Sequence, residues 1–138
     1  MASTISRSGT ALNHGEDRKM DIARIQQELA EFSEERAWDK FHSPKNLCMA
    51  LAGESGELLE IFQWLTEEQS ENIGIGSKDY VAVAEELADI LIYAMRLADK
   101  VHVDLDTAVR DKMAANALKY PIALAHGNAT KYNRRNEV

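Results

Sequence analysis

The sequence is poor in the residues that break helices or cross-link chains. Its 138 residues include 2 prolines, 7 glycines and a single cysteine. So few breaks favour long helices, and a hydrophobic fraction of 45% with 28% charged residues is typical of a globular chain. The totals therefore predict one all-α domain. The lone Cys48 permits no internal disulfide, and its apolar surroundings predict a small core residue in a reducing compartment.

Long apolar runs and excess positive charge are also lacking. No run approaches the roughly 20 apolar residues that a membrane span needs, and no apolar segment of a secretion signal stands near the amino terminus. We therefore expect a soluble, cytoplasmic protein with no membrane partner. A net charge of -7 argues against a nucleic-acid partner. The four histidines show no clustered ligand spacing, which disfavours zinc.

Apolar spacing, with capping residues at the expected starts, divides the chain into four predicted helices. They cover about residues 22–37, 44–65, 78–101 and 105–120. The polar segment 66–79 is expected to be a connecting loop; its glycines allow a mobile lid or a simple turn, and the turn is favoured. Residues 1–19 are predicted to be a flexible leader, 20–125 the helical domain and 126–138 an irregular basic tail.

The third predicted helix is apolar on nearly every side. Leu87, Ile90 and Leu91 share one face, and Ile92 and Met95 lie opposite. Such a helix is expected at the centre of a bundle, and in so short a chain its second face is expected to meet another subunit. The sequence therefore predicts an oligomeric four-helix bundle.

Two acidic pairs interrupt the apolar helices. Glu54 and Glu57 lie three residues apart on the second helix, and Glu86 and Asp89 repeat the spacing on the third. Residues three apart share a helix face, and ionised carboxylates at the edge of a core need a cation or a donor. Salt bridges to basic stripes elsewhere are the simpler explanation of either pair alone. Together the pairs predict a cage of oxygen ligands for Mg²⁺ or Mn²⁺.

Other metals fit this pattern less well. Di-iron bundles use Glu-x-x-His, and here Glu60 and Ile92 stand where the histidines would follow. A hydrated Mg²⁺ in an oxygen cage usually meets a phosphate, and Lys112 and Lys119 on the fourth helix offer matching cations. The residues alone thus predict a metal-dependent phosphate-ester or anhydride hydrolase.

Aromatic residues gather between the first two predicted helices. For Trp38 and Phe41 the pattern leaves two roles open, a hydrophobic clasp between helices or a surface that stacks on a base. For His42, composition favours a surface or capping contact over catalysis.

Residues from about Ile22 to Tyr132 resemble the MazG-like all-α nucleoside triphosphate pyrophosphohydrolases, most closely their dCTP pyrophosphatase branch. The resemblance rests on Glu-x-x-Glu followed by Glu-x-x-Asp and on the motifs around them. These are FxxERxW at 32–38, FHxPKN at 41–46, GExGELxEIFQW at 53–64, EELxDxLIY at 85–93 and KxxxNxxKYP at 112–121. One position departs, since Leu29 stands where close relatives often carry a histidine.

The resemblance implies roles for individual residues. Glu54, Glu57, Glu86 and Asp89 would bind Mg²⁺, with Glu54 or Glu57 as the base. The substrate would be bound by Trp38, His42, Asn46, Trp64, Tyr93, Lys112, Asn116, Lys119 and Tyr120. Indoles stack on bases and lysines neutralise phosphate charge, so each type suits its role.

The implied reaction is Mg²⁺-dependent hydrolysis of a deoxynucleoside triphosphate, dCTP or a modified form, to the monophosphate and pyrophosphate. The implied assembly is a homotetramer or at least a dimer, with sites where subunits meet. Three alternatives stay open: a dUTP or broad house-cleaning hydrolase, a non-catalytic nucleotide-binding module, and a structural bundle with a solvated acidic face.

Overall fold

The computed structural model describes residues 19–134, and every regular element within that range is helical. Its elements are α1 (Ile22–Glu35), η1 (Asp39–Phe41), α2 (Pro44–Phe62), α3 (Glu67–Glu71), α4 (Lys78–Lys100), α5 (Leu105–Lys119), α6 (Ile122–Ala125) and η2 (Tyr132–Arg134). The all-α class is confirmed. The predicted leader, apart from Lys19, and the last four residues of the predicted tail lie outside the described range.

The long helices begin where short polar side chains cap them. Ser43 and Ser77 each accept a hydrogen bond from the backbone N–H three residues on, at 3.2 Å. Asp21 and Asp104 do the same at 3.1 and 2.8 Å. Each bond satisfies a donor that the first turn leaves free, so local chemistry fixes these starts.

Three local expectations need correction. The first helix ends at Glu35, because Ala37 takes a left-handed backbone with φ 53°. The predicted loop contains α3, which begins with a capping box between Thr66 and Gln69. A short helix, α6, follows Pro121, beyond the end of the fourth predicted helix, where no helix was predicted.

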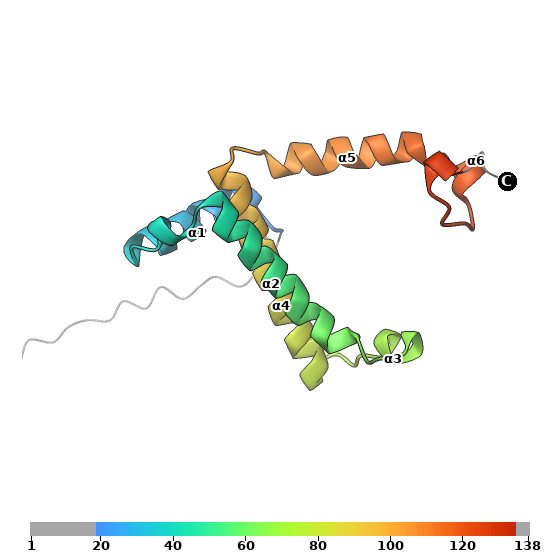
Figure 1. The fold of residues 1–138 in the computed structure, drawn as a ribbon, viewed down its shortest axis with the longest axis horizontal. Coiled ribbons are helices and arrows are strands. Elements are labelled where there is room, and N and C mark those ends of the chain that lie inside the picture. Colours follow the sequence, from blue (N-terminus) through green and yellow to red (C-terminus); the bar gives the residue numbers. More distant parts are fainter. Residues whose placement is uncertain (1–18, 135–138) are drawn as a thin grey trace, which may run out of the picture.

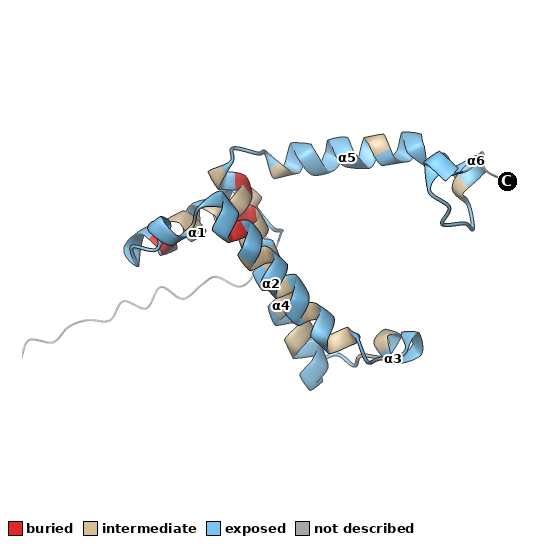
Figure 2. Cartoon of the chain, in the orientation of Figure 1, coloured by how far each residue is buried: buried red, intermediate tan, exposed pale blue. Residues whose placement is uncertain are grey.

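Helices α2 and α4 lie side by side along much of their length, and α1 crosses the carboxyl-terminal half of α4 (Figure 1). Gln26 on α1 donates a hydrogen bond to the Met95 carbonyl of α4 at 3.0 Å. The buried apolar residues Leu47, Met95 and Ala98 gather where α2 begins and α4 ends (Figure 2). The short helix η1 connects α1 to α2.

Leu47 is the largest fully buried side chain of the described residues, at 1% exposure. Replacing it with alanine should destabilise the chain by about 2–5 kcal/mol, because the cavity left by the missing side chain would be only partly refilled. Urea denaturation would measure the loss. The same change at exposed Leu59 is the control and should cost far less.

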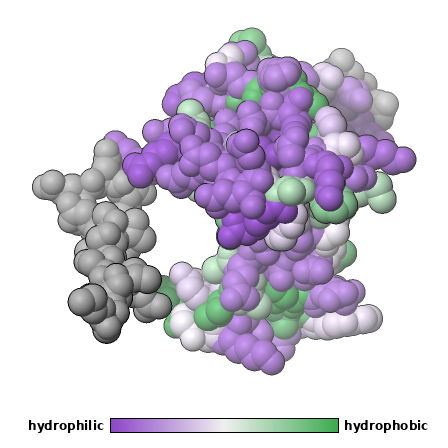
Figure 3. Space-filling model, turned by 90° about the vertical axis from the view of Figure 1, so that its left-hand side faces the viewer, coloured by the Kyte–Doolittle hydropathy of each residue, from purple (hydrophilic) through white to green (hydrophobic). Residues whose placement is uncertain are grey.

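Many apolar side chains are exposed to solvent in a single chain. Leu87 and Leu91 of α4 are 47% and 44% exposed, so the expected central burial of this helix is not reached. Cys48 is exposed, contrary to its predicted place in the core, because the neighbouring Leu47 takes the inward position and the next residue turns 100° away. In space-filling view, apolar side chains reach the surface in patches among polar ones (Figure 3).

Helix α5 extends away from the α2–α4 pair and carries α6 at its far end (Figure 1). Its apolar residues have little to pack on, and Met113 and Leu118 are 66% and 85% exposed. The chain turns into α5 at His102, whose φ of 59° is left-handed. None of the helices between residues 19 and 134 has the length and apolar character that a membrane crossing requires.

Candidate functional site

The packing of α2 against α4 brings three of the four predicted acids together. Carboxylate oxygens of Glu54, Glu57 and Glu86 all lie within 4.8 Å of one another. Glu54 and Glu86 are half-buried and Glu57 is exposed, so the cluster opens to solvent on one side. One oxygen of Glu86, Oε2, is buried and accepts no hydrogen bond from the described residues. We call these three residues the acid cluster.

The charges of the acid cluster repel one another. Burial, followed by the nearby Glu57, Asp89 and Glu86 carboxylates, raises the pKa of Glu54 above its usual 4.5. Burial and the carboxylates of Glu57 and Asp89 likewise raise the pKa of Glu86. A bound cation would oppose both rises in pKa, because its positive charge favours the ionised carboxylates and gives the orphaned oxygen a partner. Oxygen ligands at this separation fit a hard divalent cation.

Proton and cation should therefore compete for the acid cluster. Affinity for Mg²⁺ is expected to fall as the pH is lowered through the raised pKa values of Glu54 and Glu86, which means above pH 4.5. The stability of the metal-free chain should show the opposite trend. A raised pKa in the folded state means that the folded chain keeps protons that the unfolded chain releases. Glu54 and Glu86 therefore destabilise the fold less as the pH falls.

Calorimetric titration with Mg²⁺ across a pH series, with thermal melts in EDTA, would measure both trends. An Mg²⁺ affinity that is independent of pH down to the ordinary carboxyl range would contradict this electrostatic account. Ca²⁺ titrations provide a control for ion size.

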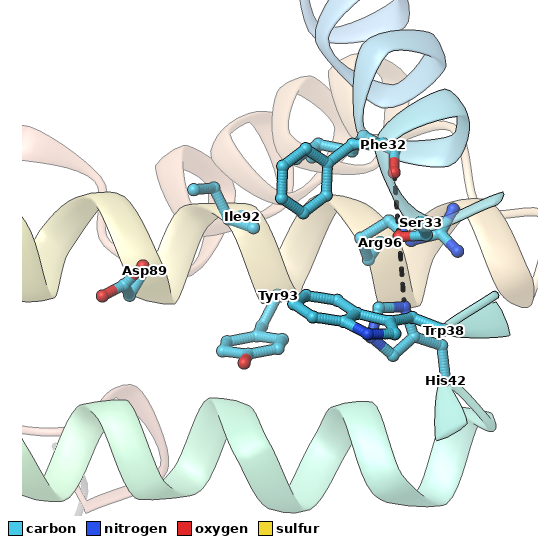
Figure 4. Close-up of a pocket in the computed structure, with 9 residues that line it drawn as sticks. Phe32, Ser33, Trp38, His42, Asp89, Ile92, Tyr93 and Arg96 are labelled. Carbon is cyan, nitrogen blue, oxygen red and sulfur yellow. Dashed lines mark hydrogen bonds between the residues drawn. The ribbon is translucent and has the colours of Figure 1, made fainter. Parts of the chain in front are cut away.

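The fourth acid, Asp89, lies outside the acid cluster but within electrostatic reach of it. It lines a cavity of about 310 Å³ enclosed by α1, the η1 segment and α4. The lining residues are Leu29, Phe32, Ser33, Trp38, His42, Asp89, Ile92, Tyr93 and Arg96 (Figure 4). Asp89 thus joins the cavity to the acid cluster. The volume is at the lower end of the range for small-molecule sites.

Trp38 serves as a clasp and as a cavity wall. Its ring meets Phe32 edge-on at 5.8 Å, and the Arg36 guanidinium covers the Phe32 ring at 3.5 Å. Trp38 is 45% exposed and lines the cavity, so the two roles left open by the sequence are compatible. Phe41 is 57% exposed and is not among the lining residues.

A buried cation lies at one end of the cavity. Arg96 is 4% exposed and contacts Asp39 and Asp99, each at 3.3 Å, and Lys100 also binds Asp39. These ion pairs tie η1 to α4 and so hold Trp38 and His42 in place. Burial and the Arg96 charge lower the pKa of His42 below its usual 6.5, although Asp39 opposes them. His42 is therefore neutral at physiological pH.

Ser33 is a site residue that was not predicted from the sequence. Ser33 is 3% exposed and its hydroxyl oxygen lies 3.4 Å from Nδ1 of His42. A signal was present, since Ile25, Leu29 and Ser33 recur at four-residue spacing and so share one helix face. A polar residue on an apolar stripe could have been flagged.

The remaining predicted residues are not brought to the cavity within one chain. Trp64 lies beyond the end of α2 and is 85% exposed. The Asn46 side chain donates to the Phe41 carbonyl at 3.0 Å and so holds the turn before α2. Four others lie on or next to the projecting α5: Lys112, Asn116, Lys119 and Tyr120. Tyr120 packs edge-on against Tyr132, with ring centroids 6.1 Å apart.

Comparison with known proteins identifies the family of this chain. Residues 51–134 match the model of the MazG-like family. The dCTP pyrophosphatase 1 proteins of rat and human are each 46% identical over 112 residues, which is 81% of this chain and 64% of theirs. The chain thus spans a little under two thirds of the length of these curated relatives.

A solved structure shows the same fold. The crystal structure of a pyrophosphatase from Archaeoglobus fulgidus superposes with a TM-score of 0.67 and 37% sequence identity. The match covers 77% of this chain and 97% of the archaeal chain. It includes most of the helical region, in which the acid cluster and the cavity lie. On the match to the family model and on these relatives, the chain belongs to the MazG-like family.

Proposed function

We propose that this chain is a Mg²⁺-dependent nucleoside triphosphate pyrophosphohydrolase that converts dCTP, or a base-modified form of it, to dCMP and pyrophosphate. The observation that carries the proposal is the position of the acid cluster beside a cavity with aromatic walls, joined by Asp89. The relatives named dCTP pyrophosphatase 1 support dCTP as the substrate.

The chemistry divides between the two parts of the site. Bound Mg²⁺ supplies positive charge to the phosphates and lowers the pKa of a water molecule. Glu54, Glu57 and Glu86, with Asp89 beside them, would hold the metal. Trp38 would stack on the base, and Tyr93 would lie against the sugar. Their combined effect is to place the α-phosphorus next to the acid cluster.

Hydrolysis then needs a base and a leaving group. Water attacks the α-phosphorus, and the bond from that phosphorus to the α,β-bridging oxygen breaks, which releases pyrophosphate. Glu54 or Glu57 accepts the proton of the attacking water.

A panel of triphosphates with product analysis tests this function. With Mg²⁺ and dCTP we expect equimolar dCMP and pyrophosphate, and no turnover in EDTA. Stepwise release of phosphate, or binding without turnover, would overturn the proposal; the second result would indicate a nucleotide-binding module instead. Faster turnover of dUTP than of dCTP would move the assignment to the house-cleaning alternative.

We further propose that the active form is a homo-oligomer, a tetramer, in which α5 of one chain covers the acid cluster of another. Two observations support this. The exposed apolar residues on α4 and α5 need a partner, and the predicted phosphate-binding Lys112 lies on the projecting helix rather than beside the acids of its own chain. Light scattering coupled to gel filtration tests the assembly, and a monomeric active enzyme would refute it.

A further inference from the structure

The hydrogen bonds of the Ser33 hydroxyl determine which ring nitrogen of His42 carries the hydrogen. It donates to the Leu29 carbonyl at 2.9 Å, one turn back on α1. A hydroxyl has one hydrogen, so toward His42 Nδ1, at 3.4 Å, the same oxygen acts as an acceptor (Figure 4). The nitrogen that faces it must then carry the hydrogen. This network assigns the Nδ1–H tautomer to His42.

Burial is the main factor that lowers the pKa of His42 and keeps its ring neutral. Among the nearby charges, Arg96 and Lys100 of α4 also disfavour protonation, whereas Asp39 of η1 favours it. In a neutral imidazole with a hydrogen on Nδ1, the other nitrogen has a lone pair and no hydrogen. His42 lines the cavity, and its Nε2 is then able to accept a hydrogen bond.

An acceptor at this position distinguishes the two kinds of pyrimidine. Cytosine carries an exocyclic amino group at position 4, which donates, whereas uracil and thymine carry an oxygen there, which accepts. An acceptor paired with the amino group gains a hydrogen bond, and one facing the oxygen is left unsatisfied. Sites built in this way reject the wrong partner far better than apolar pockets do.

We propose that Ser33 is a specificity-determining positioning residue, which fixes the tautomer of His42 so that Nε2 accepts a hydrogen bond from the exocyclic amino group of the base. The inference rests on the proposed function, because it requires that the cavity hold the base. In addition, the site would be selective for 4-aminopyrimidines, and this selectivity would depend on Ser33, which does not itself touch the base.

Ser33→Ala tests the proposal, with Ser70→Ala as the matched control. Ser70 also donates its hydroxyl to a helix carbonyl, that of Glu67 at 2.6 Å, but lies on α3 away from the cavity. The ratio of kcat/KM for dCTP to that for dUTP should fall by roughly tenfold or more in Ser33→Ala, as expected for one misplaced hydrogen bond, and stay unchanged in Ser70→Ala. Ser33→Thr keeps the hydroxyl and should restore the ratio, and thermal melts would check that each variant is folded.

A second readout does not depend on turnover. Nitrogen-15 shifts of the His42 ring, assigned with a His42→Asn variant, should show a hydrogen on Nδ1 in the unaltered chain and a shift toward Nε2–H in Ser33→Ala. The dCTP preference should also decline as the pH falls through the lowered pKa of His42, because protonation turns Nε2 into a donor. Taking the ratio of two substrates cancels the titration of the acid cluster.

The tautomer of His42 and the selectivity of Ser33→Ala separate the possible outcomes. An unaltered chain with hydrogen on Nε2, or a folded Ser33→Ala variant with unchanged selectivity, would overturn the proposal. A chain with the Nδ1–H tautomer that hydrolyses no triphosphate would overturn the proposed function, and with it base recognition by Nε2.

Discussion

Replacing Glu86 with glutamine is expected to reduce kcat/KM for dCTP by roughly a thousandfold, since metal-ion catalysis contributes several kcal/mol at 1.36 kcal/mol per factor of ten. The same change should raise the melting temperature of the metal-free chain. Glu86 lies beside the carboxylates of Glu57 and Asp89, and one of its own oxygens is buried and unpaired. A neutral amide at this position removes the charge repulsion, which destabilises the fold of the metal-free chain. Loss of activity together with gain of stability separates a metal ligand from a structural ion pair, whose removal lowers both.

The control for this prediction is Glu60→Gln, one turn along α2 from Glu57 on the exposed surface. It removes one negative charge from the helix that carries Glu54 and Glu57, and it should leave both measurements unchanged. Glu57→Ala and Asp89→Ala should also abolish turnover. Mg²⁺-dependent activity retained in both of these variants would refute the metal site.

Two inactive variants are expected to restore each other when they are assembled together. If Lys112 of one chain completes the site at the acid cluster of another chain, Lys112→Ala inactivates the α5 part of a site and Glu57→Ala inactivates the acid part. A hybrid of the two then contains sites in which both sides are intact. For random pairing of equal amounts, about a quarter of the sites combine intact acids with an intact α5.

Co-expression with two different affinity tags, followed by tandem purification, would isolate the hybrids for assay. The control pairs Glu54→Ala with Glu57→Ala; these lie on one helix, so every site keeps a defective acid cluster and no recovery is expected. Hybrids of Lys112→Ala and Glu57→Ala with no more activity than their parents would show that each chain completes its own site.

The helix starts and the acid cluster could be predicted because they depend on short-range chemistry. Serine or aspartate before an apolar periodic run satisfies free N–H groups wherever it occurs, and Glu54 and Glu57 share a face by helix geometry alone. The α3 capping box was equally local and was overlooked. Cys48 was misplaced because a one-residue error in phase turns a side chain from the core to the surface.

The rest of the site depends on contacts between distant segments. The spacing of Glu86 and Asp89 matches that of Glu54 and Glu57, yet Asp89 borders the cavity instead of joining the cluster. The fold of the segment after α1 brings Ser33 to His42, and the packing of that segment against α4 lets Arg96 reach Asp39. The course of α5 was also beyond prediction, because its apolar residues, among them Val109, Met113 and Leu118, form no single stripe that indicates a packing partner.

The cavity and the acid cluster share α4, but their remaining residues come from different parts of the chain, and this makes the site partly modular. The acids come from α2 and α4, whereas Leu29, Phe32, Ser33, Trp38 and His42 come from α1 and the segment that follows it. Asp89 is where the two halves meet. Base preference can therefore drift in evolution, or be redesigned in the laboratory, through substitutions between residues 29 and 42 that leave the hydrolytic centre untouched.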